Sequence, residues 1–434
     1  MHIHFIGIGG IGVSALAQYY LAKGFEVSGS DLSKNETIDF LRKKGAKISV
    51  GSQRKENLHK DADLVIYSPA VERDNPEMRE AERKGIECKS YPEALGDLTR
   101  KYFTIAVSGT HGKSTTTAMA ALVLVCAKLD PVVIVGTKLK EFKGSNFRMG
   151  KKILLIEADE HFASFLNYRP KTIVLTNIEK DHLDYYKNLG NLLKSFKKYV
   201  KLLPEDGTLI ANRDDRNVRN IDFENTCWYS LKSNGKDARL LKKILKVPGS
   251  HNVSNALAVL ALARRMGIKD KISFSALGKF NGTWRRFETR EANLKGKRKV
   301  IVVSDYGHHP TEVLATVRAA REKWPEKKIW LVFQPHQLQR TFYLFNDFVS
   351  ALRSVPADRI YVTDIFFVAG REEKGMEAKV SSKKLVDKVG KKSVEYVPKA
   401  QILGFLENNL RSGEVAIIMG AGDIYKTALE LGKE

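Results

Sequence analysis

The chain has 434 residues, too many for one compact core, so we expect two to four domains. Hydrophobic residues make up 43% of the sequence, and this composition excludes a disordered or fibrous protein. The formal net charge is +23, and the lysines are spread along the chain without interleaved aromatic residues. This distribution argues against nucleic-acid binding and indicates a solvated basic surface. The alternative is that the positive charge steers polyphosphate substrates to the protein.

Short apolar runs alternate with helical patterns along the whole chain, which is typical of parallel α/β sheets. In the first block we expect strands and helices at residues 2–9, 11–23, 26–29, 36–44, 63–68 and 75–84. A polar connection, YPEALGDLTRKY, separates this block from the strand FTIAVSG. We therefore place the first domain boundary at residue 100.

The second block contains the strands ILLIEAD and TIVLTNIE and a long helix over 252–266, and it ends near GTWRRFE. The alternation then restarts with VIVVSDY, a helix from Thr311, KIWLVFQ, a helix over 345–352, RIYVTDI and VAIIMGAGD. We predict three α/β domains, with boundaries at 1–100, 101–284 and 285–434.

Two further features favour a cytoplasmic location. Cys88, Cys126 and Cys227 are far apart and form no paired or metal-ligand spacing, which fits a reducing compartment. The first residues lack the basic region and cleavage site of a signal peptide. The most apolar stretch, residues 118–135, contains two charged residues and a proline, so it predicts a buried helix and strand instead of membrane insertion, which needs about 20 apolar residues.

A glycine-rich turn follows the first predicted strand. It satisfies the pattern G-x-G-x-x-G and opens a helix with Gly7, Gly9, Gly10, Ile11 and Gly12. Asp31 ends the next strand, where an acid that binds a ribose would lie. The pattern suggests a dinucleotide enzyme, but such a turn accepts any pyrophosphate, including that of a UDP-sugar. A tight turn without a ligand is the third alternative.

A second glycine-rich loop between a strand and a helix resembles a Walker A loop, although Val107 occupies the position of its first glycine. Its predicted ATP-binding residues are Gly109, Thr110, His111, Gly112, Lys113, Ser114 and Thr115. Backbone N–H groups for phosphate oxygens, the Lys113 ammonium for the β- and γ-phosphate charge, and the Ser114 hydroxyl for Mg²⁺ are all retained. We predict that ATP binds here, with Lys113 as a catalytic residue.

Further motifs follow in a fixed order. GTHGKSTTTAM resembles the ATP loop of the Mur ligase family, and the resemblance continues through EADEHFASF, TNIEKDHLDYY, HNVSNALA, WRRFE, SDYGHHPTE, FQPHQLQRT and MGAGDI. With HFIGIGGIGVSALA at the front, it covers essentially the whole chain. The GIGGIG start and the DYGHHPTE segment are most similar to those of the alanine-adding members of the family.

The resemblance implies a Rossmann-like UDP-binding domain, a central P-loop-like ATPase domain and a carboxyl-terminal α/β domain that binds the amino acid. It implies that the lactyl carboxylate of UDP-N-acetylmuramate attacks the γ-phosphorus of ATP, and that L-alanine then displaces phosphate from the acyl phosphate. It further implies a cytoplasmic step of peptidoglycan synthesis, and we expect the protein to be a monomer or a homodimer. The first turn, Asp31 and Ser68 would then bind the UDP-sugar.

Candidate metal ligands follow two buried strands. Glu157 follows ILLI, and Asp181 and His182 follow TIVLTN, so these side chains emerge at the carboxyl ends of the strands. By resemblance, Ser114 and Glu157 hold one Mg²⁺, and Glu157 and His182 hold a second, with Mn²⁺ as an expected substitute. Two cations would neutralise the γ-phosphate during transfer. A capping or core role is the alternative for His182.

The resemblance adds further ATP-binding residues. His251, Asn252 and Asn255 open a helix and are expected near the base of ATP, with N-capping as the alternative. Arg286, at the expected hinge, and Asp305, at a strand end, are expected to reach ATP when the third domain closes. A salt bridge at a domain junction is the alternative for this pair.

The third domain is expected to bind the amino acid. Tyr306, His308 and His309 lie in one loop, and His336 and Arg340 lie in another. The Arg340 guanidinium offers a bidentate fork for the carboxylate. Either His308 or His336 is expected to accept the proton of the amine. Asp423, in the GAGDI turn, is expected to close the same pocket.

Three segments depart from the family pattern. Gln337 stands where alanine-adding members have arginine in H-R-x-x-R-T, which removes a charge from the predicted pocket and leaves the amino acid open. Ser114 replaces the usual threonine but keeps the hydroxyl. VAGREEKGM, which includes Arg371, replaces an A-G-E-x-P run. Rival hypotheses are a recycling ligase that adds a preformed peptide to UDP-N-acetylmuramate, and an NAD-dependent dehydrogenase built on the first turn.

Overall fold

The structure is a computed structural model that describes residues 1–368, 372 and 375–433, so Arg371 lies outside the described residues. The chain forms two compact units. The amino-terminal unit comprises Met1–Ile178, Leu193–Ser233 and Leu257–Leu277, and the carboxyl-terminal unit comprises Glu179–Leu192, Asn234–Ala256 and Gly278–Glu434. Across the described ranges, no helix has both the length and the apolar character needed to cross a bilayer.

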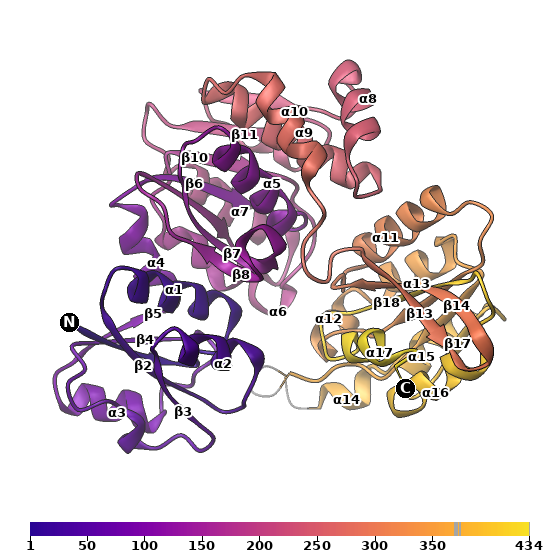
Figure 1. Ribbon diagram of the computed structural model, residues 1–434, viewed down its shortest axis with the longest axis horizontal. Helices are drawn as coiled ribbons and strands as arrows, with labels where there is room; N and C mark the ends of the chain where they lie inside the picture. Colours follow the sequence, from indigo (N-terminus) through magenta and orange to yellow (C-terminus); the bar gives the residue numbers. More distant parts are fainter. Residues whose placement is uncertain (369–371, 373–374, 434) are drawn as a thin grey trace. The chain divides into compact units, whose positions relative to one another are not determined.

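The first sheet has five parallel strands in the order β3-β2-β1-β4-β5 (Figure 1). Its elements are β1 (His2–Ile6), α1 (Ile11–Ala22), β2 (Glu26–Asp31), α2 (Glu36–Lys43), β3 (Lys47–Val50), β4 (Leu64–Tyr67), α3 (Pro76–Arg83), β5 (Glu87–Ser90) and α4 (Tyr91–Thr99). Strand order reverses between β1 and β4, which is the switch point where parallel sheets bind ligands. The predicted parallel α/β architecture of this block is confirmed.

Strand β1 is buried along its whole length, and its two histidines have partners inside the fold. His4 contacts Ser28 Oγ through Nδ1 (2.8 Å) and Glu77 Oε2 through Nε2 (2.9 Å). His2 contacts the same Ser28 oxygen through Nε2 (2.7 Å). Buried polar groups that are hydrogen-bonded in this way support the fold, so these histidines are structural.

The segment YPEALGDLTRKY is not the polar connection that we expected, because most of it is helix α4. Ser90 and Glu93 form a capping box, and Pro92 lies in the first turn. Leu95 and Leu98 are buried. The polar residues made the segment look like a linker, but they belong to the outer face of an amphipathic helix.

The second sheet of the amino-terminal unit has seven strands in the order β12-β11-β10-β6-β9-β7-β8, and only the β7–β8 pair is antiparallel. Its strands are β6 (Phe103–Ser108), β7 (Val132–Leu139), β8 (Ser145–Arg148), β9 (Ile153–Ala158), β10 (Thr172–Leu175), β11 (Thr208–Asn212) and β12 (Thr226–Tyr229). The helices that belong wholly or mostly to this second part of the unit are α5 (Lys113–Cys126), α7 (Leu189–Val200), α9 (Ser250–Arg265) and α10 (Asp270–Lys279). The buried helix and strand predicted over 118–135 are therefore confirmed as α5 and β7.

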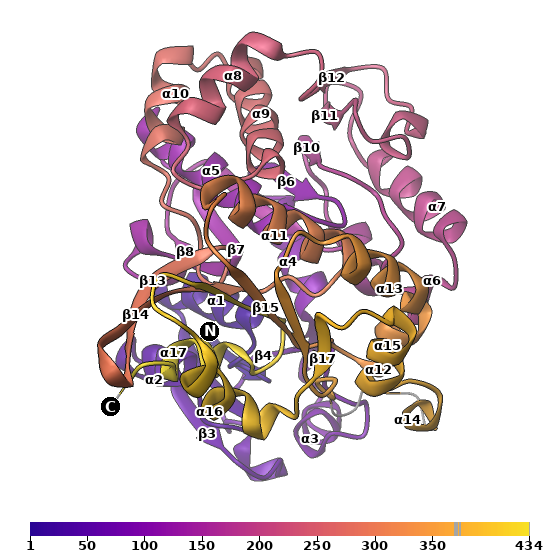
Figure 2. The same ribbon diagram turned by 90° about the vertical axis from the view of Figure 1, so that its right-hand side faces the viewer.

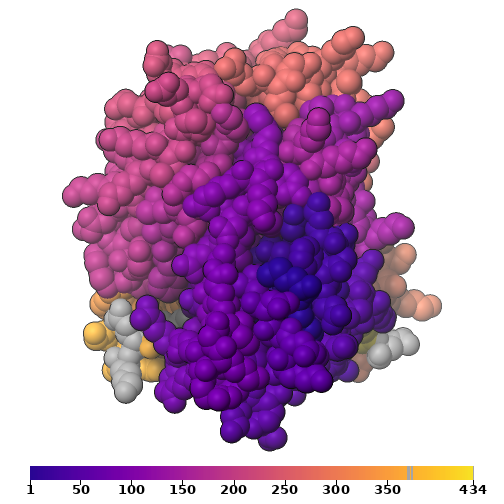
Figure 3. Space-filling view, turned by 90° about the vertical axis from the view of Figure 1, so that its left-hand side faces the viewer, coloured from indigo at the N-terminus to yellow at the C-terminus, as the bar shows by residue number. Residues whose placement is uncertain are grey.

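Helix α1 joins the two sheets of the amino-terminal unit through buried polar contacts. The Gln18 side chain donates to Asn146 Oδ1 (2.7 Å) and accepts from Ser145 Oγ (2.8 Å). Asn146 also donates to the carbonyl of Ile11 (2.5 Å). Figure 3 shows the indigo and violet parts of this unit adjoining on one face. The network fixes the start of the first helix against β8.

The carboxyl-terminal unit contains a six-stranded sheet in the order β13-β14-β18-β15-β16-β17, in which only β13–β14 is antiparallel. Its strands are β13 (Glu288–Leu294), β14 (Arg298–Asp305), β15 (Ile329–Phe333), β16 (Arg359–Val362), β17 (Val394–Tyr396) and β18 (Val415–Met419). Its helices are α6 (Leu183–Tyr186), α8 (Gly235–Ile244), α11 (Pro310–Lys323), α12 (Leu338–Tyr343), α13 (Phe345–Ser354), α14 (Met376–Lys379), α15 (Ser382–Val389), α16 (Lys399–Asn409) and α17 (Tyr425–Glu430).

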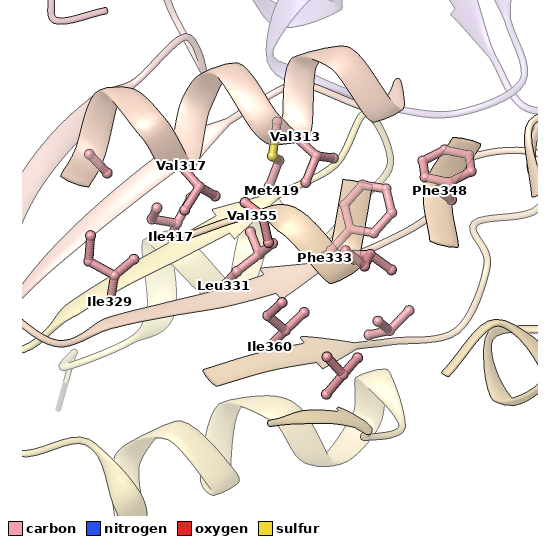
Figure 4. Packing of buried hydrophobic residues seen from close by; sticks show 14 of the residues in the cluster. Val313, Val317, Ile329, Leu331, Phe333, Phe348, Val355, Ile360, Ile417 and Met419 are labelled. Carbon is pink, nitrogen blue, oxygen red and sulfur yellow. The ribbon is translucent and has the colours of Figure 1, made fainter. Parts of the chain in front are cut away.

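Helices cover both faces of this sheet (Figure 2). Along β18, Ile417 and Met419 pack with α11 and α13 in one core, while Ile418 packs with α16 and α17 in the other. Figure 4 shows the first core, where Val313 and Val317 of α11 face the sheet. Alternation along a strand that is buried on both faces produces the continuous apolar run VAIIM.

Candidate functional site

The first glycine-rich turn is shaped by its own surroundings. Gly7 has φ +76°, which favours glycine. The N–H of Gly9 donates to Asp31 Oδ2 (2.9 Å), so this carboxylate ties the turn to the end of β2. A Cβ on Gly12 would lie 2.9 Å from the Tyr91 ring of α4. The approach of Asp31 explains the glycine at position 9, and the close packing against α4 explains the glycine at position 12, without any ligand.

The structure brings two of the predicted UDP-sugar residues together. Ser68 follows β4, and a Cβ on Gly7 would lie 3.0 Å from the Ser68 Cβ. Both residues lie beyond the carboxyl ends of adjacent strands, at the switch point of the sheet. Gly10 and Ile11 begin α1 next to them, so its first N–H groups open at the same edge.

The phosphate loop links β6 to α5. Gly109 has φ +130° and Gly112 has φ +81°, both in the region that favours glycine. The Lys113 ammonium donates to the carbonyl of Gly109 (2.7 Å) and to Glu160 Oε2 (2.8 Å). The loop therefore curls around its own lysine, and Ser114 and Thr115 follow in the first turn of α5.

Glu160 is a site residue that the sequence interpretation missed. Its side chain is 1% exposed and pairs with Lys113. Burial raises the pKa of the Glu160 carboxyl to about 8, although the Lys113 ammonium opposes this shift. Burial alone would lower the pKa of Lys113, but the carboxylates of Glu160 and Asp159 outweigh it and raise that pKa. The available signal was a second glutamate, three residues beyond Glu157 in the same motif.

Glu157 lies next to the phosphate loop in the sheet. β9 pairs with β6 so that Glu157 is opposite Val107, two residues before Gly109. A Cβ on Gly136 of β7 would lie 2.7 Å from Glu157 Oε2, so the glycine leaves room for this carboxylate. A carboxylate and the Ser114 hydroxyl are oxygen donors of the kind that Mg²⁺ prefers, so these residues fit the predicted ion. His182 belongs to the carboxyl-terminal unit, where its Nε2 lies 3.7 Å from Asp181 Oδ2.

The two arginines of WRRFE have different environments. Arg285 is buried, donates to the carbonyls of Gly420 (2.5 Å) and Gly422 (3.0 Å), and packs on the ring of Tyr425. Arg286 keeps 28% of its side chain exposed and pairs with Glu312 (3.3 Å). Arg285 therefore holds the GAGD turn in place, whereas Arg286 is the arginine that remains accessible to a ligand.

The other predicted ATP residues of the carboxyl-terminal unit are mostly buried. Asp305 accepts the N–H groups of Phe287 (2.8 Å) and Gly307 (2.7 Å), so its carboxylate fixes two loops of its own unit. Burial raises the pKa of Asp305. Asn252 donates to the carbonyl of Pro248 (2.7 Å), and Asn255 is buried one turn later in α9. Their contact with ATP stays a prediction.

The predicted amino-acid residues form one cluster in the carboxyl-terminal unit. Arg340 Nε donates to Asp181 Oδ1 (2.9 Å), and Arg340 NH1 lies 3.2 Å from His336 Nδ1. The rings of His336 and His308 are 5.8 Å apart, and those of His308 and Tyr306 are 5.5 Å apart. The sequence did not indicate that Asp181 would accept a hydrogen bond from the Arg340 guanidinium. The carboxylate of Asp423 accepts one hydrogen bond from the Gln334 amide (3.2 Å) and another from the Lys399 ammonium.

The histidines of SDYGHHPTE have separate roles. His309 is buried and uses both ring nitrogens, because Nε2 contacts the carbonyl of Lys180 (2.9 Å) and Nδ1 accepts from Thr311 (3.2 Å) as a helix cap. His308 Nδ1 lies 3.2 Å from the carbonyl of Tyr306, so this nitrogen carries the proton and Nε2 carries the lone pair. Of these two adjacent histidines, His308 is the one with a lone pair on Nε2.

We expect this unit to lose stability as the pH falls from about 6.5 to about 4. Burial, with repulsion from Arg340, lowers the pKa of His308 to about 4, and burial with Arg286 lowers the pKa of His251 to about 4. The unfolded chain binds more protons in this range, so protonation favours unfolding. Urea unfolding at a series of pH values should give a shallower slope for His308→Asn than for the wild type. Equal slopes would contradict the burial of a neutral His308.

Three family models match the chain in order. The Mur ligase family, catalytic domain matches residues 2–103, the Mur ligase middle domain matches 107–263, and the Mur ligase, glutamate ligase domain matches 285–422. UDP-N-acetylmuramate–L-alanine ligase of Clostridium botulinum (strain Langeland) is 40% identical to this chain, over 98% of the chain and 96% of the relative. The chain belongs to the Mur ligase family. The enzyme of the same name from Acetivibrio thermocellus is 39% identical to this Mur ligase, over 98% of the chain and 94% of the relative.

Solved structures have the same fold. The crystal structure of UDP-N-acetylmuramate-alanine ligase from Thermotoga maritima matches this Mur ligase with a TM-score of 0.81 and 29% identity, covering 99% of this chain and 98% of that one. A murein peptide ligase from Psychrobacter arcticus matches with a TM-score of 0.70 and 23% identity, covering 99% and 98%. The predicted α/β fold class and family are confirmed.

Proposed function

We propose that this Mur ligase joins L-alanine to the lactyl carboxylate of UDP-N-acetylmuramate, using ATP and forming an acyl phosphate, in cytoplasmic peptidoglycan synthesis. The observation that carries the proposal is 40% identity over nearly the whole chain with ligases named for this reaction. The phosphate loop with Lys113, and the cluster around Arg340 in the unit that would bind the amino acid, support it. We also propose that the protein is a monomer or a homodimer.

In this scheme residues 1–100 bind the UDP-sugar, 101–284 bind ATP and 285–434 bind the amino acid. The Lys113 ammonium and the N–H groups at the start of α5 take the phosphates of ATP. Arg286 supplies a further positive charge for the γ-phosphate. We infer that the protein must exclude water while the acyl phosphate exists, because water would hydrolyse it.

The proposed Mg²⁺ ligands are Ser114, Glu157 and His182. Bound Mg²⁺ would neutralise the charge of the phosphates during transfer, and Mn²⁺ is the proposed substitute. His308 is the proposed acceptor of the amine proton, because it is neutral near pH 7 and carries the lone pair on Nε2. Arg340 is proposed to hold the carboxylate of the amino acid through the donors that Asp181 leaves available.

Phosphate release with Mg·ATP tests the proposal. UDP-N-acetylmuramate is supplied together with L-alanine, glycine, L-serine or a tripeptide, one at a time. Release that requires both the UDP-sugar and L-alanine is the expected result. A preference for the tripeptide would favour the recycling activity, and a preference for another amino acid would assign the change in specificity to the loop around Gln337. Absence of ATP binding, with binding of NAD, would contradict the proposal.

A further inference from the structure

The phosphate loop is held from the side by the end of the neighbouring strand β10. Thr176 and Asn177 follow this strand directly. The Asn177 side chain accepts the N–H of His111 at Oδ1 (2.8 Å) and donates from Nδ2 to the carbonyl of His111 (3.0 Å). One side-chain amide therefore satisfies both backbone polar groups of a single loop residue.

The backbone and the preceding side chain add to this contact. The carbonyl of Asn177 accepts the N–H of Thr110 (3.0 Å), and the Thr176 hydroxyl lies 2.7 Å from the carbonyl of His111. A Cβ on Gly109 would lie 2.2 Å from Thr176 Oγ1 and 2.9 Å from the Asn177 carbonyl. The loop must pass this close to β10, and this explains why Gly109 is a glycine.

These contacts decide which loop N–H groups face a ligand. The N–H groups of Thr110 and His111 point to Asn177, and the first helical bond runs from Thr116 to the carbonyl of Gly112 (2.9 Å). The N–H groups of residues 112–115 precede that bond and have no partner of the intrahelical kind. The N–H groups of residues 112–115 are therefore the ones available for phosphate oxygens. The loop residues predicted from the sequence to bind ATP, 109–115, are thereby reduced to 112–115 for backbone contacts.

The strand end is itself supported from behind. Asn212, at the end of β11, donates to the carbonyl of Thr176 (2.8 Å). Asn217 donates to the carbonyl of Ile178 (2.7 Å), and its own N–H is held by Asp215 (2.9 Å). Because the carbonyls on both sides of Asn177 are fixed, its side-chain amide meets His111 in one orientation. Supporting hydrogen bonds of this kind hold the residues of a catalytic loop within about 0.5 Å of the geometry that the reaction needs.

We propose that Asn177 is the positioning residue of the phosphate loop, and that it acts through His111 to aim the N–H groups of residues 112–115 at the phosphates of ATP. This inference rests on the proposed ATP-dependent reaction. Asparagine is needed because the contact requires one donor and one acceptor. Aspartate would keep the acceptor, lose the donor and add a negative charge beside a site for anions.

The test compares Asn177→Ala and Asn177→Asp with a matched control at Asn225. The Asn225 side chain donates to the carbonyl of Gly207 (2.6 Å) at the opposite end of the same sheet, and it accepts from Arg265 (3.3 Å). Asn225→Ala and Asn225→Asp therefore remove a similar amide–backbone contact far along the strands from the loop. For each protein we would measure kcat, the KM values of the three substrates, the Kd of ADP and the Tm.

We expect Asn177→Asp to lower kcat/KM for ATP by on the order of 10²-fold, the cost of misplacing a catalytic contact by about 1 Å. The Kd of ADP should rise in both Asn177 variants, with the KM of L-alanine unchanged, while the Asn225 variants change only the Tm. The inference is overturned if the Asn177 and Asn225 variants bind ADP equally well, or if all three KM values shift together with the Tm. Wild-type protein that bound no ATP would overturn the proposed function itself, and this inference with it.

Discussion

Replacing Lys113 with methionine is expected to lower kcat by on the order of 10²–10³-fold, the effect of removing one preorganised donor from a transition state with developing charge. The Lys113 ammonium lies within the loop that precedes α5 and is held by the carbonyl of Gly109 and by Glu160. Methionine has a similar length but no charge, so the loop loses the cation for the γ-phosphate and keeps its packing. Initial rates with saturating substrates measure this loss.

The variant also removes the cation that pairs with the buried Glu160, which lowers the stability of the protein. A loss of activity alone would therefore not separate a catalytic effect from a loss of stability. The double variant Lys113→Met/Glu160→Gln also replaces this acid with a neutral amide of nearly the same shape. We expect it to be as inactive as the single variant but to have a higher Tm. If the double variant regained activity, the loss would come from instability and the proposed role of Lys113 would be wrong.

Replacing Arg340 with methionine is expected to destabilise the carboxyl-terminal unit by about 3–5 kcal/mol, the usual cost of removing one member of a buried ion pair. The side chains of Arg340 and Asp181 are 7% and 6% exposed, and their atoms are 2.9 Å apart. Without the guanidinium, the Asp181 carboxylate is left desolvated. Three of the four tryptophans, Trp284, Trp324 and Trp330, belong to this unit, so fluorescence during urea unfolding reports on it.

The paired variant Arg340→Met/Asp181→Asn separates the ion pair from the amino-acid site. It should recover part of the stability lost in the single variant, because neither charge is then buried alone. Activity should not return, and the KM of L-alanine should stay raised, if Arg340 also holds the substrate carboxylate. Additive effects on stability would show that the two residues are not coupled.

The parallel sheets could be predicted from the sequence because they bury both faces. The run VAIIM contains no polar residue, and FTIAVS is buried from Thr104 to Ser108, hydroxyl residues included, which distinguishes both runs from strands with one face exposed to water. Helix α4 was missed because most of its charged side chains lie on one outer face and its capping residues resemble a turn. Edge strands such as β3 were also missed, because they are short and exposed and lack an apolar run.

The site was predictable where one residue type carries one kind of chemistry. A lysine after a glycine loop, or an acid at the end of a buried strand, indicates its role from its position. Contacts between distant segments gave no such signal: Glu160 with Lys113, Asp181 with Arg340, and Asn177 with His111 all depend on which strands are neighbours. Nor does the sequence distinguish Arg285 from Arg286, because only the buried environment separates these adjacent arginines.

The polar junction between α1 and β8 bears on how such enzymes can be recombined. A chimera made at residue 100 would take Gln18 from one parent and Ser145 and Asn146 from the other. Unless the parents match at these positions, buried amides would face side chains that cannot complete their hydrogen bonds. A crossover after β8 would instead inherit the junction whole, so exchangeable segments of this protein need not coincide with its sheets.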